Sequence, residues 1–400
     1  MNFSKSIAVK RDRAYMTRII AVATLTLGLP FLASQAHAQA GVPTSGAVGD
    51  KDHMSYGADA DRITDEIKGF NDFTGGGQKY AEMSAYDEVA KMGAGINVIP
   101  GWDGYWNGRS TKFKLSYIRK IKEAGFDTVR IPLQTFDKAG VHIDTQGHLD
   151  PKYLAKLDAV VEAALSAKLF VIIDEHDYDT CSKDADACAQ ILPNVWYELS
   201  EHFKNAPSTV MFELLNEPHD KVDAAIWNAW IPDLVSIVRQ TNPTRNIVIG
   251  PTHWNSSGDL PLLQLPADKH IIVTFHYYEP MTFTHQGATW VGPEIEKERG
   301  EIQWKGTSEE LAKLNGDFDR VAAWAKANNR PILLGEYGTY AKFSAMDDRA
   351  AWTRAVTKAA ADRGFARAAW EFSEGPDGFT LFDEDKGQWV EPIEDAVLLK

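Results

Sequence analysis

Side chains that can do chemistry stand at the C-terminal ends of short apolar runs along this chain of 400 residues. His176 ends one run, Asn216 and Glu217 end the next, and Glu336 ends a later one. Taken singly, each of these residues is more often structural than functional. Because chance would scatter polar residues along the runs, their collection at one end indicates a shared site. Other runs carry further candidates: Arg130, Trp254, His276, Tyr278 and Trp370.

The two glutamates Glu217 and Glu336 define the chemistry that such a site would perform. Hydrolysis of a glycosidic bond uses one carboxylic acid to protonate the leaving oxygen and one carboxylate to attack carbon or activate water. A carboxyl separation of about 5–5.5 Å gives a covalent intermediate and retained configuration, whereas roughly 6.5–9.5 Å leaves room for water and gives inversion. The fold has to set this separation.

The elements that position these residues follow a regular alternation. Apolar runs typical of buried strands alternate with longer amphipathic stretches, one of which opens with Pro151 at a plausible first helical turn. Strands that alternate with helices indicate a parallel sheet, and eight of them predict an α/β fold, a (β/α)8 barrel (TIM barrel), with a doubly wound open sheet as the alternative. The eight runs span 95–100, 127–133, 169–176, 209–217, 246–251, 270–278, 331–338 and 365–372.

Several motifs resemble glycoside hydrolase family 5, the cellulase-type retaining β-glycosidases. LLNEPHD, FHYYEP, LLGEYG and AAWEF occur in the family's order, with VRIPL upstream, and the resemblance covers roughly residues 83–400. It implies a (β/α)8 barrel, with Glu217 as general acid/base and Glu336 as nucleophile. A guanidinium and a tyrosine hydroxyl beside Glu336 would hold its pKa down, while the charge of Glu336 would keep Glu217 protonated.

The resemblance also implies supporting roles for residues at the other strand ends. Arg130 corresponds to the arginine beside the nucleophile, and Asn216 to the amide that contacts the sugar 2-hydroxyl. His276 and Tyr278 correspond to a pair near the carboxylates, and Trp370 to the floor of the subsite at the cleavage point.

His176 corresponds to the first member of a pair that is often His-His in the family. Asp177 follows it in this chain, so only His176 is carried over.

Four tryptophans in the loops are candidates for stacking on pyranose rings. Trp102 and Trp106 follow the first run, Trp254 follows the fifth and Trp290 follows the sixth. For each of them, burial under a loop is the structural alternative. Trp254 and Trp290 are the preferred sugar contacts.

The only cysteines, Cys181 and Cys188, lie in a polar segment after the third run. In an exported protein they predict one disulfide that closes a small polar loop and braces a wall of the cleft. Free or metal-binding thiols are the alternative, although two sulfurs without a second pair make a poor zinc signature.

The N-terminus predicts export. Residues 1–38 combine basic residues, an apolar run and an A-x-A cleavage site, as in a signal peptide; Met16 is an alternative start. A membrane anchor is disfavoured because the apolar run is short. Residues 39–82 have little apolar periodicity and indicate an extended or partly disordered polar lead-in before the catalytic domain at 83–400. The protein is therefore expected to be secreted or periplasmic.

Charge restricts the partners. Removing residues 1–38 takes away five basic residues and one acidic residue, which changes the formal net charge from −14 to −18. A strongly acidic surface disfavours nucleic acid and anionic membranes, whereas a neutral polysaccharide suffers no repulsion. The expected partner is a β-glucan polysaccharide or oligosaccharide, bound by a monomer without cofactor or metal.

The leading hypothesis is an exported, endo-acting, retaining β-1,4-glucanase. A β-mannanase or a β-1,3-glucanase of the same family stays open, because the carboxylate pair is shared. A metal-dependent hydrolase is a second class, suggested by the segment 174–179 beside His276. Strand alternation argues against it, because Asp174 and His176 should face opposite to Glu175 and Asp177. A non-catalytic sugar-binding barrel is a third class, which would need neither glutamate.

Overall fold

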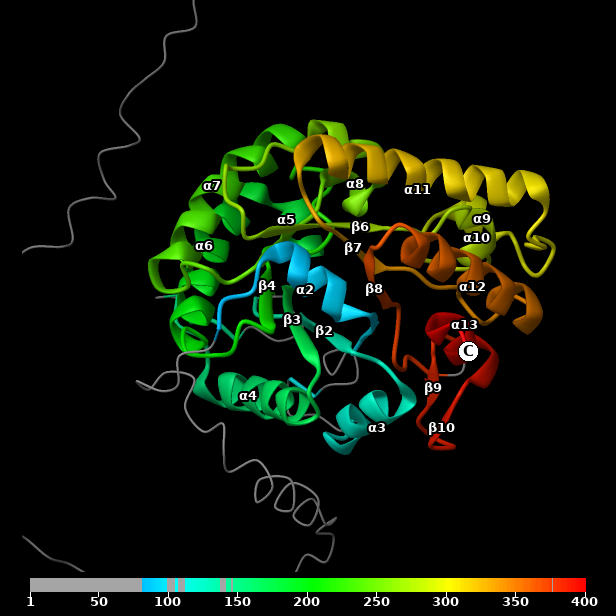
Figure 1. The fold of residues 1–400 in the computed structure, drawn as a ribbon, viewed down its shortest axis with the longest axis horizontal. Helices are drawn as coiled ribbons and strands as arrows, with labels where there is room; N and C mark the ends of the chain where they lie inside the picture. The colour runs from blue at the N-terminus through cyan, green and yellow to red at the C-terminus, as the bar shows by residue number, and fades with distance from the viewer. Residues whose placement is uncertain (1–80, 99–104, 107–111, 137–141, 145–146, 376) are drawn as a thin grey trace, which may run out of the picture. The chain divides into compact units, whose positions relative to one another are not determined.

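Eight parallel strands close into a barrel in the order of the sequence, with helices between them (Figure 1). The computed structural model describes residues 81–98, 105–106, 112–136, 142–144, 147–375 and 377–400. The predicted (β/α)8 barrel is confirmed, and the open-sheet alternative is wrong. The signal peptide, all but the last two residues of the polar lead-in, and Trp102 lie outside the described residues.

Each barrel strand overlaps one of the predicted runs. The strands are β1 Ala94–Asn97, β2 Thr128–Leu133, β3 Phe170–Glu175, β4 Val210–Glu213, β5 Ile247–Ile249, β6 Ile271–His276, β7 Ile332–Glu336 and β8 Ala366–Ala369. The largest difference concerns the run 209–217, because β4 ends at Glu213 and Glu217 therefore lies beyond the strand.

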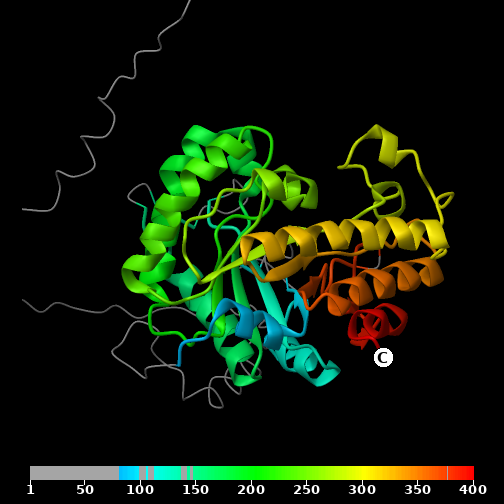
Figure 2. The same cartoon turned by 45° about the horizontal axis from the view of Figure 1, so that its top comes forward.

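The helices that follow the strands have conventional start signals. Helix α4 begins with Pro151 after the N-cap Asp150, and Thr307 and Glu310 form a capping box on α11. Helices α11 and α12 run side by side (Figures 1 and 2). The helices are α2 Ala85–Met92, α3 Ser116–Ala124, α4 Pro151–Ser166, α5 Tyr178–Lys183, α6 Ala185–His202, α7 Ala224–Thr241, α8 Thr252–Asn255, the 3₁₀ helix η1 Ser257–Leu262, α9 Met281–Thr284, α10 Pro293–Glu296, α11 Ser308–Asn328, α12 Met346–Asp362 and α13 Glu391–Leu398; a small hairpin pairs β9 Phe382–Asp383 with β10 Gln388–Trp389.

Among the described helices, none combines the length and the apolar character needed to cross a membrane.

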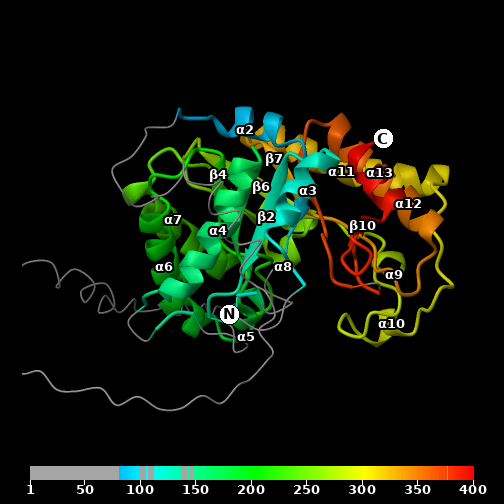
Figure 3. The same cartoon turned by 90° about the horizontal axis from the view of Figure 1, so that it is seen from below.

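Strand alternation divides the core into two parts. Outward side chains such as Ile131 and Phe212 pack under the helices, whereas inward ones such as Ile172 and Met211 form an inner cluster with α2. Figure 3 shows α2 at one end of the barrel and the short helices α5, α8, α9 and α10 toward the other. Because α2 and apolar side chains fill the N-terminal end, polar chemistry is left to the C-terminal end.

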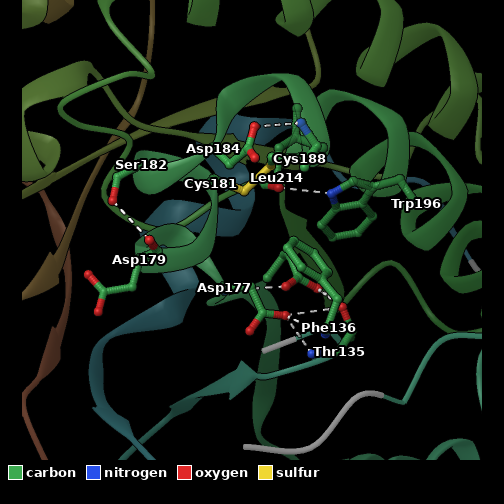
Figure 4. Close-up of a disulfide and its surroundings, with 12 residues drawn as sticks. Thr135, Phe136, Asp177, Asp179, Cys181, Ser182, Asp184, Cys188, Trp196 and Leu214 are labelled. Atoms are coloured by element: carbon green, nitrogen blue, oxygen red, sulfur yellow. Dashed lines mark hydrogen bonds between the residues drawn. A yellow bond between two sulfur atoms is a disulfide. The ribbon is translucent and has the colours of Figure 1, made fainter. Parts of the chain in front are cut away.

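The predicted disulfide between Cys181 and Cys188 is present, with 4.9 Å between the Cα atoms (Figure 4). The expectation of a loop was wrong, because the two cysteines lie on consecutive helices, α5 and α6. Asp184 separates these helices and accepts a hydrogen bond from the backbone N–H of Ala187, which starts α6. Trp196 of α6 contacts the segment that follows β4, because its indole N–H donates to the carbonyl of Leu214 (Figure 4).

Candidate active site

Glu217 stands on a turn, contrary to the predicted strand end. Three residues separate it from β4, and its φ of +42° lies in the left-handed region, which costs a non-glycine residue of order 1–3 kcal/mol. The turn is held on both sides. The N–H of Asn216 donates to the carbonyl of Glu175, and Nδ1 of His219 donates to the carbonyl of Glu217 at 2.7 Å. Surrounding contacts therefore fix an unfavourable backbone that directs this carboxyl.

Glu336 is the last residue of β7 and has both carboxylate oxygens in hydrogen bonds. Arg130 donates to Oε1 at 2.7 Å, and the hydroxyl of Tyr278 donates to Oε2 at 3.0 Å. The Glu336 side chain is 5% exposed and that of Arg130 is fully buried. The predicted placement of Arg130 and Tyr278 around Glu336 is thus the one observed.

Arg130 is the centre of a buried network. It donates to the side-chain oxygens of Asn97 at 2.8 Å and Asn216 at 2.7 Å. It also pairs with Glu213, at 2.7 Å and 3.0 Å, and with Asp174 at 3.0 Å. Together with Glu336 of β7, three carboxylates therefore surround the single guanidinium of Arg130. Burial raises the pKa of Asp174 and that of Glu213 to about 7 each, although Arg130 opposes the shift.

Asn97 and Glu213 were not among the predicted site residues. Both end their strands but lie inside the apolar runs 95–100 and 209–217, and this interruption of the runs was the signal that could have found them. Asn97 is fully buried, and its amide nitrogen donates to backbone carbonyls of β7 and β8 besides its bond with Arg130.

His176 and Asn216 form a second edge of the site. Asn216 accepts from Arg130 through its side-chain oxygen, and one N–H of its amide faces Nε2 of His176, which leaves the second N–H for another acceptor. His176 lies 3.5 Å from that amide nitrogen, donates from Nδ1 to Asp174 at 2.6 Å, and stacks on Trp370 with 5.7 Å between ring centroids. Burial lowers the pKa of His176 to about 4, so the ring is neutral.

Asp177, which stands where the family often has a second histidine, serves a loop. Its Oδ2 accepts hydrogen bonds from the backbone N–H groups of Thr135 and Phe136, at 2.6 Å and 2.8 Å (Figure 4). Its neighbour Glu175 accepts from the Thr135 hydroxyl at 3.0 Å. The alternation expected of the segment 174–179 is therefore confirmed, because these two acids bind the loop after β2 while Asp174 faces Arg130.

His276 joins the two glutamates. Its Nδ1 lies 2.7 Å from Oε1 of Glu217 and 3.5 Å from Oε2 of Glu336. Gly335 leaves room for the imidazole, because a Cβ there would come within 2.5 Å of Thr274 Oγ1 and 3.1 Å of His276 Nε2. One oxygen of each glutamate and one nitrogen of His276 all lie within 4.8 Å of one another.

These three groups also have the spacing that could hold a metal ion. Two features count against a resident metal. The Arg130 guanidinium and the Tyr278 hydroxyl already use both oxygens of Glu336, and a guanidinium beside a carboxylate repels a cation.

The two carboxyls differ in their proton affinity. Burial and then the charge of Glu336 raise the pKa of Glu217 well above its ordinary value. Burial also raises the pKa of Glu336, and the charge of Arg130 and the hydrogen bond from Tyr278 oppose that rise. Arg130 and Tyr278 thus lower the pKa of Glu336 as predicted, but burial outweighs them and the net shift is upward. Their opposition still makes Glu336 the more acidic carboxyl of the pair.

The predicted sugar platforms differ in exposure. Trp254 is 45% exposed and stacks on His219 with 4.4 Å between centroids, and Trp290 is 58% exposed at the edge of Tyr340. The prediction that Trp106 is a candidate sugar platform is wrong. It is 3% exposed and packs against Tyr153 of α4, so it belongs to the core.

Arg130→Met is expected to lower the free energy of unfolding at pH 7 by about 3–5 kcal/mol, because it leaves buried carboxylates without a cation. The loss should shrink toward pH 5, where those carboxyls take up protons. Without the opposing charge the pKa of Glu336 rises further, so the acidic limb of kcat/KM should move to higher pH. Urea titrations at both pH values and a pH–rate profile measure these effects.

Arg130→Lys is the matched variant, because it keeps the charge but not the planar fork. It should recover part of the stability. Equal stability of all three proteins would contradict the network described for Arg130.

Comparison with known proteins identifies the family of this chain. The sequence profile described as Cellulase (glycosyl hydrolase family 5) matches residues 89–375. The chain therefore belongs to glycoside hydrolase family 5 and is a glycoside hydrolase. Membership of this family accounts for both the barrel and the two carboxyls at its C-terminal end.

Most of the similar proteins are named endoglucanases, and a cellodextrinase of Ruminococcus flavefaciens is also among them. Endoglucanase H of Acetivibrio thermocellus is 31% identical over 290 residues, which make up 72% of this chain and 30% of that protein. The chain thus spans under a third of the length of that relative. A hyperthermophilic endo-β-1,4-glucanase solved in complex with substrate is 36% identical, with a TM-score of 0.73 over 80% of this chain and 100% of that one. Cel5A of Thermotoga maritima, solved with cellobiose, is 30% identical, with a TM-score of 0.72 over 78% and 99% of the two chains.

Proposed function

We propose that this protein is an endo-acting retaining β-1,4-glucanase, with Glu217 as general acid/base and Glu336 as nucleophile. The observation that carries the proposal is the closeness of two carboxyls in unequal surroundings. An oxygen of Glu217 lies within 4.8 Å of an oxygen of Glu336, which favours the short separation of retaining enzymes over the wider gap that admits water.

The first step uses the two protonation states. Glu336, oriented by Arg130 and Tyr278, attacks the anomeric carbon. Glu217 gives its proton to the leaving oxygen, so the glycosidic bond breaks and a glycosyl-enzyme forms. The available N–H of Asn216 grips the sugar 2-hydroxyl more tightly as positive charge grows at the ring, which favours the transition state.

The second step follows from the loss of charge on Glu336. Once it is esterified, the repulsion that kept Glu217 protonated disappears and the pKa of Glu217 falls. Glu217 then acts as base, takes a proton from water and directs that water to the anomeric carbon. The sugar leaves with its original configuration and Glu336 is released as a carboxylate.

The substrate class rests on the aromatic platforms and on the similar proteins. Exposed indoles at Trp254 and Trp290, with Trp370 stacked on His176, offer flat apolar faces to pyranose rings. The similar structures include complexes with cellobiose and, for the same Thermotoga maritima protein, with mannotriose. A β-1,4-glucan is therefore the proposed substrate, and a β-mannan is the second candidate; a β-1,3-glucan remains the third.

Trp254→Ala and Trp290→Ala are each expected to raise KM for cello-oligosaccharides up to about tenfold with little change in kcat, since a lost stacking contact is worth up to about 1.5 kcal/mol. Tyr197→Ala is the matched control. Tyr197 is exposed to a similar extent, at 50%, but lies on helix α6. An unchanged KM in both tryptophan variants would remove these residues from the binding cleft.

Export belongs to the same proposal. The basic, apolar and A-x-A segments of residues 1–38 support a cleaved signal peptide, and the single disulfide suits an oxidising compartment. A secreted or periplasmic monomer that acts on a neutral polysaccharide fits a mature charge of −18. N-terminal sequencing of the protein recovered outside the cytoplasm tests the cleavage site.

The test of the function is product analysis on carboxymethylcellulose, barley glucan, mannan and laminarin. An endo-glucanase lowers the viscosity of the first two long before reducing ends accumulate. Predominant cleavage of mannan or laminarin would replace the β-1,4-glucan assignment. Loss of activity in EDTA with recovery on adding metal would favour the metal-dependent class instead.

A further inference from the structure

Asn255 is a buried amide beside the active site that no prediction included. It is fully buried and ends α8, as the last of three consecutive residues whose φ values lie between +52° and +59°. Such left-handed backbone costs non-glycine residues of order 1–3 kcal/mol each and persists only where surrounding contacts impose it. The next residue, Ser256, forms a parallel bridge with His276. This strained turn sets the Asn255 side chain against the imidazole.

The contact between Asn255 and His276 has a direction. The amide nitrogen of Asn255 lies 3.2 Å from Nε2 of His276. The side-chain oxygen of Asn255 packs against Gly250, because a Cβ on that glycine would lie 2.1 Å from it. This oxygen has no hydrogen-bond partner among the described residues. An amide nitrogen can only donate, so Nε2 is the acceptor. A neutral imidazole with a bare Nε2 carries its proton on Nδ1.

The groups on the opposite side of the His276 ring independently place the proton on Nδ1 as well. Nδ1 faces Oε1 of Glu217 at 2.7 Å and Oε2 of Glu336 at 3.5 Å. Because an ionised carboxylate only accepts hydrogen bonds, a bare Nδ1 would repel Glu336. Burial lowers the pKa of His276 well below its ordinary value, so the ring is neutral and has one N–H to place. Both neighbours of the imidazole favour Nδ1–H.

We propose that Asn255 is a positioning residue that holds His276 as the Nδ1–H tautomer and thereby keeps the catalytic proton of Glu217 on Oε2. The Nδ1–H donates to Oε1, which must then be the carbonyl-type oxygen of the protonated carboxyl. The acid proton is left on Oε2, free to reach the leaving oxygen of the substrate. This inference rests on the proposed role of Glu217 as general acid.

The opposite tautomer would misdirect the proton. With hydrogen on Nε2, the bare Nδ1 would accept the hydrogen bond of the Glu217 carboxyl, and the proton would point at the imidazole. General acid catalysis contributes about 10²–10⁴-fold to such reactions, so its loss has a large effect on substrates with poor leaving groups. Substrates whose leaving group needs no proton would react at an unchanged rate in the first step.

The direct test is ¹⁵N NMR of the protein labelled at histidine, with His276→Gln used to assign the His276 signals. We expect a protonated Nδ1 and a bare Nε2 in the unmodified protein. A proton on Nε2 would overturn the inference. Because the tautomer is read without substrate, this result is separate from the success or failure of the proposed function.

Asn255→Asp tests the consequence. A carboxylate at this position accepts a hydrogen bond, so it should transfer the proton of His276 to Nε2, which the same spectrum monitors. With the tautomer reversed, kcat/KM on cello-oligosaccharides should fall about 10²–10³-fold. The burst that reports the first step with 2,4-dinitrophenyl cellobioside should stay within about twofold.

Ser256→Ala is the matched control, because the Ser256 side chain only accepts from the N–H of Gly258. It should change neither the spectrum nor the rates. A reversed tautomer in Asn255→Asp with equal losses on both substrates would overturn the positioning role.

Discussion

Glu336→Gln is expected to lower kcat on cello-oligosaccharides by about 10⁵-fold, the largest effect of any substitution in this protein. Glutamine keeps the shape of the side chain and an oxygen to accept from Arg130, but an amide does not form the glycosyl ester. Binding of cellotetraose, followed by calorimetry, should persist. A variant that keeps more than a few per cent of the activity would remove Glu336 from the nucleophile role.

Glu336→Ala with added azide gives a control that also reports the role. Azide can attack the anomeric carbon of an activated β-glycoside from the face that Glu336 occupied, while Glu217 stays in place. The product should be the α-glycosyl azide, identified by NMR. A β-glycosyl azide would mean that the two glutamates have been assigned in the wrong order.

Glu217→Gln is expected to produce a loss that depends on the leaving group. With cello-oligosaccharides, kcat/KM should fall about 10³–10⁴-fold, because no proton reaches the departing oxygen. With 2,4-dinitrophenyl cellobioside the first step needs no acid and should proceed. The second step then lacks its base, so the glycosyl-enzyme should accumulate and appear as a burst of dinitrophenolate and as a mass increase of the protein.

The stability of this variant provides its control. A neutral amide should be accommodated at position 217 at least as easily as the half-buried carboxyl of Glu217, whose ionisation the site disfavours, so Glu217→Gln should not unfold earlier than the unmodified protein in urea. Equal losses on natural and activated substrates, without a burst, would contradict the acid/base role.

The sequence predicted the barrel well because its strands are buried on both faces. Apolar runs at 127–133 and 270–278 correspond closely to β2 and β6, since packing under the helices and inside the barrel both demand apolar residues. The run at 209–217 was extended too far for the same reason. Leu214 and Leu215 continue the apolar pattern beyond β4, but they pack in the core from a turn, and no glycine marks that turn.

Residues whose role depends on a distant partner were harder to predict. Glu213 interrupts the apolar run 209–217 without an evident reason until Arg130 of β2 is seen to bind it with two hydrogen bonds. Asn255 likewise acquires meaning only beside His276. The polar segment with both cysteines reads as a loop, yet it forms the two helices that the disulfide links. Such features arise from contacts between elements, which residue spacing does not encode.

The net effect of burial on the pKa of Glu336 could not be predicted from the sequence either. The charges around Glu336 predicted a lowered pKa, but the depth of the site decides the direction. The predicted order of the two pKa values, with that of Glu336 below that of Glu217, is kept, because Arg130 and Tyr278 contact Glu336 and not Glu217. That order is what the proposed mechanism needs.

The anomeric configuration of the first product tests the central claim most directly. Proton NMR during the first minutes of cellopentaose hydrolysis distinguishes the newly formed reducing end before mutarotation equilibrates it. A carboxyl pair this close predicts that the β-anomer appears first and the α-anomer only later. Initial release of the α-anomer would contradict attack by Glu336 and the double displacement built on it.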